Sequence, residues 1–379
     1  MTGLVKGEEG GQILFLARVS KNDDVQETRS DPGAPIFIDF ECLKTKPPHP
    51  ALLGVLIGSE GEDLQQLITD PELAPARVAK RKRTHAVDLN EAIRELLAMA
   101  AAEHRPIVGW SYFDRDRLIE ACPDLKSEIT ARYVNALHIA RPWRKHLYPT
   151  FKIEREDEHS ARHTLDQYAA LAGYPHASAF KDAKPARWIR HVREQLRATG
   201  GNYGRTTSET KRDWHKLLDY NRHDLLALRH IVLRAARELE CWRAYERTRF
   251  CVDEGPRRIC FMAGSRSPRL QALLRRHGVA TWAFVTAWNP ASVPQRPEQN
   301  AQRQLELMEL VAAKGYGMLP GEGIGEDPKW TPEESVLILG IGRREAIRLG
   351  RRFGQLAIVV GKLEGPASLV SCAAPPRIR

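Results

Sequence analysis

The chain has 379 residues, of which 42% are hydrophobic and 28% are charged, and its formal net charge at pH 7 is +10. This composition excludes a disordered polymer and is typical of a soluble globular protein with room for two domains. No apolar run reaches the ~18 residues of a bilayer-spanning helix, and no basic region precedes the first apolar stretch as in a secretory signal.

The first part of the chain predicts an α/β fold. The first 30 residues are expected to form an N-terminal arm. Three strands are then expected in succession, followed by a helix and a fourth strand, which predicts a mixed sheet with flanking helices. The expected elements are strands at 35–42, 52–57, 64–68 and 106–110 and a helix at 89–103 that Asp88 would cap.

The next part is expected to be mostly helical. A helix should open at Asp114, and the polar stretch 141–160 should be irregular. Further helices are expected at 164–172, 186–198 and 208–247, and the last of them could break near Tyr220.

A second pattern of helices and strands follows and predicts a second, small α/β domain. The strands include 280–287, 335–340 and 357–361, and a Gly-rich loop is expected at 315–325. The expected organisation is an arm at 1–30, a first domain at 31–248, a linker at 249–267, the second domain at 268–365 and a tail at 366–379.

Asp39 and Glu41 lie two residues apart in the apolar run 35–43. Side chains alternate along a strand, so both carboxylates should point to the same face of the sheet. Two carboxylates on a buried strand are costly unless a cation meets them, and Mg²⁺ and Mn²⁺ prefer such oxygen ligands. The alternative is a strand end at which both acids reach solvent.

Asp114 comes just after the strand predicted at 106–110. Alone, it could simply cap the helix that follows. Asp116 is close enough in the sequence to take the place of Asp114 as a ligand.

Tyr220 and Asp224 are four residues apart in the predicted helix 208–247 and therefore share one face. The apolar positions of this face continue toward the C-terminus, which places Asp224 beside the buried stripe. Tyr220 could instead be a core aromatic whose hydroxyl reaches water. His215 and His223 are interpreted as ordinary surface or packing histidines.

These motifs together resemble the DEDD superfamily of 3′–5′ exonucleases. A strand Asp-x-Glu, a strand-end Phe-Asp and a helical Tyr-Asn-x-x-Asp are closest to the tyrosine subclass and to the ribonuclease H-like branch known as RecB-type predicted nucleases. The resemblance covers about 35–240 and implies a ribonuclease H-like mixed sheet. Trp110 and Ser111 stand where the family usually has Asn or His.

The resemblance implies that four acids, Asp39, Glu41, Asp114 and Asp224, bind two ions of Mg²⁺ or Mn²⁺. Asp39 would lie between the two metal ions, and Glu41 would position the attacking water. Tyr220 would orient that water or help to deprotonate it. Two such ions stabilise the attacking and leaving oxygens of a displacement at phosphorus.

The expected function is a metal-dependent 3′–5′ exonuclease, a phosphodiester hydrolase acting on single-stranded DNA or RNA. The alternatives are a non-catalytic nucleic-acid-binding module and a structure-specific endonuclease on the same fold. The segment 163–174 resembles a short helix that these nucleases carry between their second and third motifs, and it is interpreted as packing.

The positive charge favours nucleic acid as the partner, although a solvated arginine-rich surface would give the same net charge. Basic clusters occur at 77–83, 141–145, 343–344 and 351–352. Tryptophans near them, Trp143, Trp188 and Trp214, could stack on bases.

The segment 280–361 resembles a small bacterial domain family of unknown function. Four polar residues in and near it, Asn289, Glu298, Asn300 and Glu334, could converge into a pocket for an unknown ligand or protein partner.

The six cysteines are scattered and show no zinc-type spacing. Reduced thiols and a cytoplasmic location are therefore expected.

Overall fold

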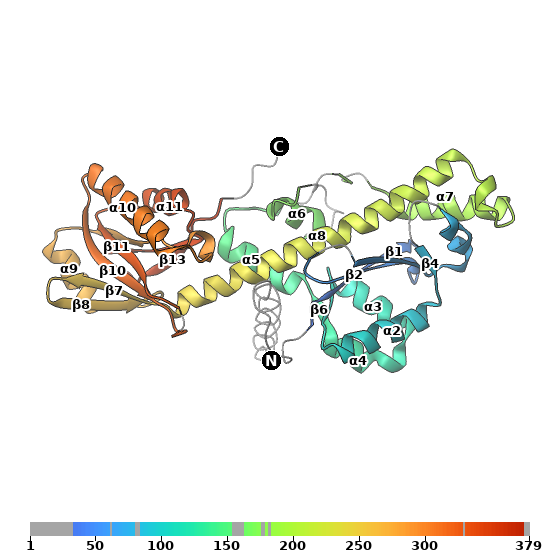
Figure 1. Ribbon diagram of the computed structural model, residues 1–379, viewed down its shortest axis with the longest axis horizontal. Helices are drawn as coiled ribbons and strands as arrows, with labels where there is room; N and C mark the ends of the chain where they lie inside the picture. Colours follow the sequence, from blue (N-terminus) through green and yellow to red (C-terminus); the bar gives the residue numbers. More distant parts are fainter. Residues whose placement is uncertain are drawn as a thin grey trace. The chain divides into compact units, whose positions relative to one another are not determined.

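The computed structural model describes residues 33–60, 63–79, 84–153, 163–175, 179–180, 183–328 and 330–374. The expected arm at 1–30 and residues 80–83 of the first basic cluster lie outside this part. The chain divides into two compact units, the first built from residues up to Arg141 and from Ile153–Arg237, the second from Pro142–Lys152 and Glu238–Pro375. Each unit contains its own sheet, which confirms the predicted α/β fold class (Figure 1).

The first unit is built on a six-stranded mixed sheet in the order β4-β3-β2-β1-β5-β6. Strand β2 pairs antiparallel with both β1 and β3, β5 runs parallel to β1, and β6 runs parallel to β5. The apolar run around Asp39 is thus a central strand with neighbours on both sides. The strands are β1 (Ile36–Leu43), β2 (His49–Ile57), β3 (Asp63–Ile68), β4 (Thr84–Ala86), β5 (Ile107–Gly109) and β6 (Tyr133–Asn135).

Helices cover both faces of this sheet. On one face, Ile36 and Ile38 pack in one core cluster with residues of α2 (Leu89–Ala102), α3 (Tyr112–Ala121) and α4 (Lys126–Arg132). On the other face, Leu52 and Ile68 pack with residues of the 3₁₀ helix η2 (Pro71–Val78), α7 (Pro185–Ala198) and α8 (Ser208–Arg247). Asp88 caps α2 as predicted, because its carboxylate accepts the backbone N–H groups of Asn90 and Glu91.

Two helices differ from the sequence expectation. The stretch 141–160 was expected to be irregular, but α5 (Leu137–Leu147) continues through Pro142; residues 154–160 lie outside the described part of the chain. Its buried residues Ile139, Trp143 and Leu147 recur at helical spacing, so burial of this face outweighs the cost of the proline. Likewise α8 does not break near Tyr220, because its buried stripe continues on both sides of that residue.

Gly54 of β2 is the point at which the sheet approaches α8 most closely. A Cβ at this position would lie 2.3 Å from Asn221 Oδ1 and 2.6 Å from Leu225 Cδ1. We therefore expect Gly54→Ala to lower the free energy of unfolding by about 1–3 kcal/mol through overpacking, measured as a lower urea midpoint. Gly342→Ala is the control, because no atom lies within 4 Å of the Cβ it adds; equal midpoints for both variants would contradict this packing.

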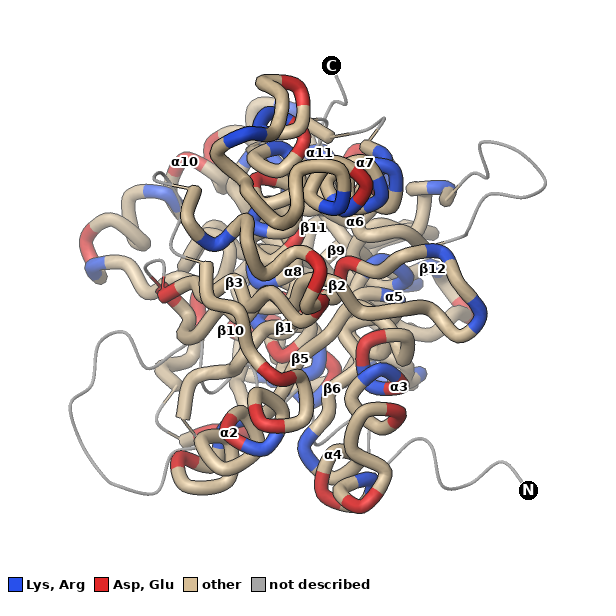
Figure 2. The backbone as a smooth tube through the Cα atoms, turned by 90° about the vertical axis from the view of Figure 1, so that its right-hand side faces the viewer, with Lys and Arg blue, Asp and Glu red and all other residues tan. Residues whose placement is uncertain are grey.

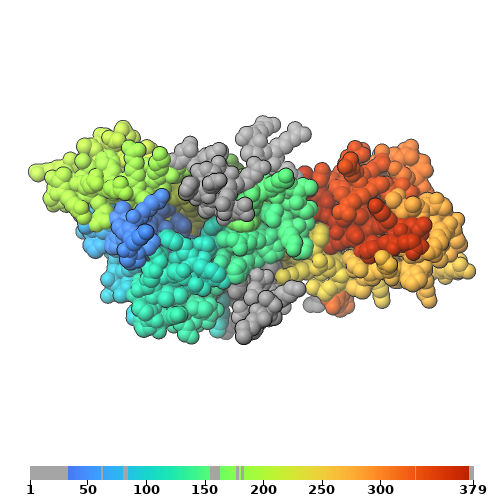
Figure 3. Space-filling model, turned by 180° about the vertical axis from the view of Figure 1, so that it is seen from behind, coloured from blue at the N-terminus to red at the C-terminus, as the bar shows by residue number. Residues whose placement is uncertain are grey.

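The second unit is built on a seven-stranded antiparallel sheet in the order β13-β12-β9-β11-β10-β7-β8. Side chains fill the interior of the unit, and the surface formed by the residues from Glu238 onward is drawn from yellow to red in Figure 3. The strands are β7 (Arg249–Glu254), β8 (Arg257–Met262), β9 (Thr281–Val285), β10 (Gly317–Ile324), β11 (Glu333–Leu339), β12 (Ala357–Lys362) and β13 (Ser368–Ser371). The helices are α9 (Pro268–Arg276), α10 (Pro297–Ala313) and α11 (Arg343–Arg352).

Three segments of this unit differ from the expectation. Residues 249–267 do not form a linker, because Phe250, Val252, Ile259 and Phe261 alternate as buried residues of the β7–β8 hairpin. The Gly-rich stretch is strand β10 rather than a loop; its Gly321 lets the strand approach Phe284 and the Cys251 carbonyl. Strand β13 occupies part of the expected tail.

Cys251 and Cys260 form a disulfide between the paired strands β7 and β8. The expectation that all six thiols are reduced is therefore wrong for this pair. Sequence spacing did not reveal it, because the two residues become opposite partners only once the hairpin forms. The other four cysteines are not disulfide-bonded.

Within the described ranges, every helix is either too short or too polar to cross a bilayer. Even the 40-residue α8 carries charged residues along its length.

Candidate metal centre

Strand β1 places two carboxylates in the interior of the first unit. Asp39 pairs with Gly54 and Glu41 with Leu52 in the antiparallel ladder with β2, so both side chains point to the same face. Glu41 is 5% exposed. The alternative of a strand end with solvated acids is thus wrong for Glu41.

Asp114 reaches the same place from the first turn of α3. Its Oδ1 accepts the backbone N–H of Phe40 at 3.3 Å, and the residue is 4% exposed. It is not the helix cap, because Ser111 occupies that position and accepts the N–H of Phe113. Asp116 instead forms an ion pair with Arg115, and 48% of its side chain is exposed. The geometry therefore favours Asp114 over Asp116 as the second-motif acid.

Helix α8 contributes the remaining predicted residues. Asp224 is buried, and the Tyr220 hydroxyl forms a hydrogen bond with its carboxylate. Tyr220 also contacts the ring of Phe180, edge to face, at 5.6 Å between centroids. Because the two residues are one helical turn apart, α8 presents both toward the acids of β1.

Asn221, which the sequence analysis did not single out, fixes the orientation of Asp39. Its amide nitrogen donates to Asp39 Oδ2 at 2.9 Å and to the Asp39 carbonyl at 3.2 Å. Its amide oxygen accepts from Gln66 Nε2 at 3.1 Å, and its side chain is fully buried. The signal in the sequence was the Tyr-Asn dipeptide itself, whose Asn lies on the face of α8 that packs on β2.

Ligand atoms of Asp39, Glu41 and Asp224 all lie within 4.8 Å of one another. A second group with the same spacing consists of Asp166, His223 and Asp224. Asp166 belongs to α6 (Leu165–Leu171), a helix that was interpreted only as packing. His223 is buried beside it, so its interpretation as an ordinary histidine missed a potential ligand. Asp224 is common to both groups.

Burial makes the ionised form of these acids costly. It is the main cause that raises the pKa of Asp39 to about 6, against the lowering effect of the Asn221 hydrogen bond. Burial, then the charge of Asp39, raises the pKa of Asp114 to about 8. The same two causes hold the pKa values of Glu41 and Asp224 well above the ordinary carboxyl value.

The donor set fits a hard divalent cation. Glu41 Oε1 is buried and accepts no hydrogen bond from any described residue. A buried acceptor without a donor is destabilising, and a cation would satisfy it. Carboxylate oxygens with this spacing suit Mg²⁺ or Mn²⁺, whereas the histidine of the second group would also suit a softer ion.

The polar residues predicted to converge in the second unit do so only in part. Asn289 Oδ1 accepts from Asn300 Nδ2 at 2.9 Å, and Asn289 Nδ2 donates to Glu333 at 2.7 Å. Glu298 and Glu334 are exposed instead. The asparagines satisfy one another and hold the left-handed turn at Asn289, so they support the loop rather than an open pocket.

The second unit contains the region with a family match. Residues 285–358 match the model of a family described as protein of unknown function (DUF3293). The match confirms the resemblance predicted for 280–361 and assigns no activity. Comparison with curated proteins gives no match. The acidic centre lies outside the matched residues, so its chemistry must be inferred from the side chains themselves.

Two of the tryptophans expected to stack on bases cannot do so. Trp143 and Trp214 are fully buried, whereas Trp188 is partly exposed. Basic and acidic residues are interspersed along the backbone in the view of Figure 2, with both colours on most of the helices drawn there. A polyanionic partner would therefore have to be bound by local groups of cations.

Proposed function

We propose that the first unit is a metal-dependent 3′–5′ exonuclease acting on single-stranded nucleic acid. The observation that carries the proposal is the buried, unpartnered Glu41 Oε1 within a cluster of carboxylates from β1 and α8. The strand order, with three antiparallel strands followed by two parallel ones, fits the ribonuclease H-like fold that the motifs resemble. Together these features support hydrolysis of phosphodiester bonds better than a purely structural role.

Each residue has a distinct task in this proposal. Asp39, Glu41, Asp114 and Asp224 would hold two ions of Mg²⁺ or Mn²⁺, and Asp166 and His223 offer further donors next to Asp224. When bound, the ions would stabilise negative charge on the attacking and leaving oxygens. Asn221 would keep the Asp39 carboxylate in one orientation.

Tyr220 would hold a water molecule rather than supply a base. Burial and the charge of Asp224 raise the pKa of its hydroxyl above the ordinary tyrosine value, so the group stays protonated at neutral pH. A neutral hydroxyl can donate to Asp224 and accept from water at the same time. It would therefore orient the nucleophile, while a carboxylate takes the proton.

The reaction can be tested with end-labelled single strands and Mn²⁺. We expect stepwise shortening from the 3′ end, no cleavage of circular strands, and loss of activity in Asp114→Asn. Asp116→Asn is the matched control. It makes the same substitution two residues further along the chain, at an acid that is exposed and paired with Arg115. Cleavage of circles would indicate an endonuclease instead. Tight binding without cleavage under any divalent metal would indicate a non-catalytic binding module.

A further inference from the structure

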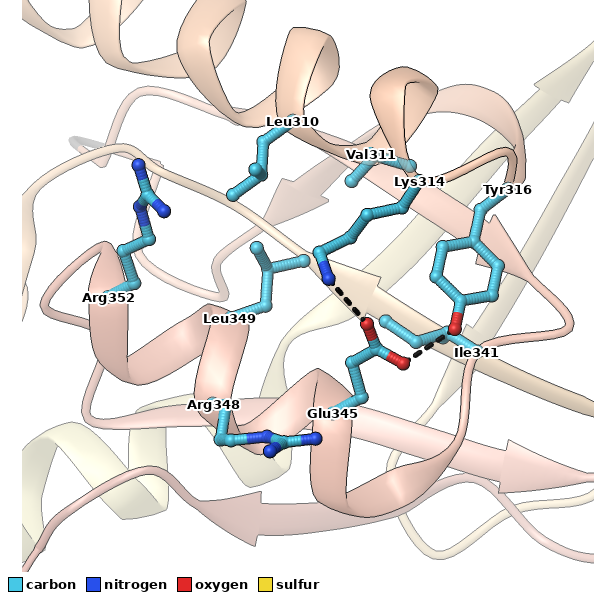
Figure 4. A pocket seen from close by; sticks show the side chains of 9 residues that line it. All are labelled: Leu310, Val311, Lys314, Tyr316, Ile341, Glu345, Arg348, Leu349 and Arg352. Atoms are coloured by element: carbon cyan, nitrogen blue, oxygen red, sulfur yellow. Dashed lines mark hydrogen bonds and ion pairs between the residues drawn. The ribbon is translucent and has the colours of Figure 1, made fainter.

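The second unit contains a cavity that none of the groups considered above uses. It lies between α10 and α11, has a volume of about 290 Å³, and is open to solvent. All of its lining residues fall inside the region with the family match. We call it the α10–α11 pocket and define it by Leu310, Val311, Lys314, Tyr316, Ile341, Glu345, Arg348, Leu349 and Arg352 (Figure 4).

One part of the pocket is apolar. Val311, Ile341 and Leu349 are buried, and Leu310 is partly exposed beside them. A purely hydrated anion would gain nothing from such a surface, whereas a ligand with a ring or an alkyl part would bury apolar area there.

Glu345 lies on the side of the pocket where α10 ends. Lys314 Nζ donates to one of its carboxylate oxygens at 2.9 Å and the Tyr316 hydroxyl to the other at 2.6 Å (Figure 4). The hydrogen bond from Tyr316, then that from Lys314, lowers the pKa of Glu345, so it is ionised at neutral pH. Its remaining lone pairs can accept an N–H group of a ligand.

Arg348 and Arg352 supply positive charge at the pocket edge. They are one turn apart on α11, both are exposed, and in the described part of the chain neither guanidinium forms a hydrogen bond or an ion pair within 4 Å. Each guanidinium can offer two parallel N–H groups to a phosphate, and Figure 4 draws the two arginines on either side of Leu349.

We infer that the α10–α11 pocket binds a nucleotide. Its phosphate is held by Arg348 and Arg352, and its base lies over Leu310 and Leu349 within reach of Glu345. A fatty acid would bring no N–H group to the remaining lone pairs of Glu345, and inorganic phosphate would leave the apolar surface uncovered. The nucleotide is either free or part of a strand, and the inference does not depend on the proposed nuclease activity.

The test uses the full chain in EDTA, with AMP, a single strand of about 12 adenylates and inorganic phosphate as probes in separate titrations. Arg348→Glu with Arg352→Glu should weaken nucleotide binding at least about 10-fold. Arg266→Glu with Arg269→Glu is the matched control, because it makes the same change of charge at two exposed arginines elsewhere in the unit. Leu310→Asp should weaken AMP binding more than phosphate binding.

Two of the probes, AMP and the adenylate strand, distinguish the sources of the nucleotide. Binding of AMP that the pocket variant loses supports a free nucleotide, and binding of the strand alone with the same loss supports a nucleotide within a polymer. Failure of both probes to bind the wild type, or equal losses in the pocket and control variants, overturns the inference. The titrations contain EDTA and measure binding without cleavage, so a failed nuclease assay leaves this result readable.

Discussion

Asp39→Asn should abolish phosphodiester cleavage while making the metal-free protein more stable. Replacing residues that merely support a metal ligand typically costs 10–100-fold in activity, so loss of a ligand shared by two ions should cost at least about 100-fold. The same substitution should increase the stability of the metal-free protein, because burial makes the Asp39 carboxylate costly to ionise. A neutral amide of the same shape removes that cost, which we expect to raise the unfolding free energy at pH 8 by on the order of 2 kcal/mol.

Both effects are measured on the same preparation, cleavage with end-labelled strands in Mn²⁺ and stability by urea unfolding in EDTA. Asp116→Asn serves as the control, since it should change neither quantity appreciably. Activity of the Asp39 variant within about 3-fold of wild type would show that the acids of β1 do not hold a catalytic metal.

Divalent metal should stabilise the protein more at pH 8 than at pH 5. The folded-state pKa values of Asp39, about 6, and Asp114, about 8, lie above those of an unfolded chain. In the absence of metal, the contribution of these acids to stability is fully present below pH ~4 and declines as pH rises through 6 and 8. A cation reverses that loss, because it binds the ionised carboxylates of the folded state only.

The measurement is the thermal midpoint with Mn²⁺ and with EDTA at several pH values. We expect Mn²⁺ to raise the midpoint by about 5 °C or more at pH 8 and by little at pH 5. Asp39→Asn should show a smaller metal effect at every pH. A metal effect that is the same at pH 5 and pH 8 would mean that ions bind elsewhere on the protein.

The acids of the candidate site could be predicted because their motifs are local. The spacing of Asp39 and Glu41 on an apolar strand predicts that their side chains share a face. The spacing of Tyr220 and Asp224 on a helix predicts the same for that pair. Asp166 and His223 could not be predicted in the same way, because they approach Asp224 only after α6 packs near α8. The role of Asn221 likewise depends on the close approach at Gly54.

The fold class was predictable from the order of strands and helices, but two boundaries were not. The β7–β8 hairpin follows directly after a 40-residue helix. Its alternation of buried and exposed residues is short, and charged residues such as Arg257 and Arg258 make it hard to recognise in the sequence. The α5 helix contains Pro142, which ordinarily ends a helix, and only the burial of Trp143 explains why it persists. In both cases tertiary packing decides what local sequence leaves open.

The second unit is assembled from two separate stretches of the chain, Pro142–Lys152 and the residues from Glu238 onward. Trp143, in the earlier stretch, is fully buried and donates its indole N–H to Glu238 at 2.7 Å. A truncated protein that stops at residue 237 would therefore keep Trp143 but lose its acceptor and expose its ring. A first unit produced by a single truncation or a single proteolytic cut would therefore tend to aggregate. To obtain the first unit alone, residues 142–152 would have to be replaced as well.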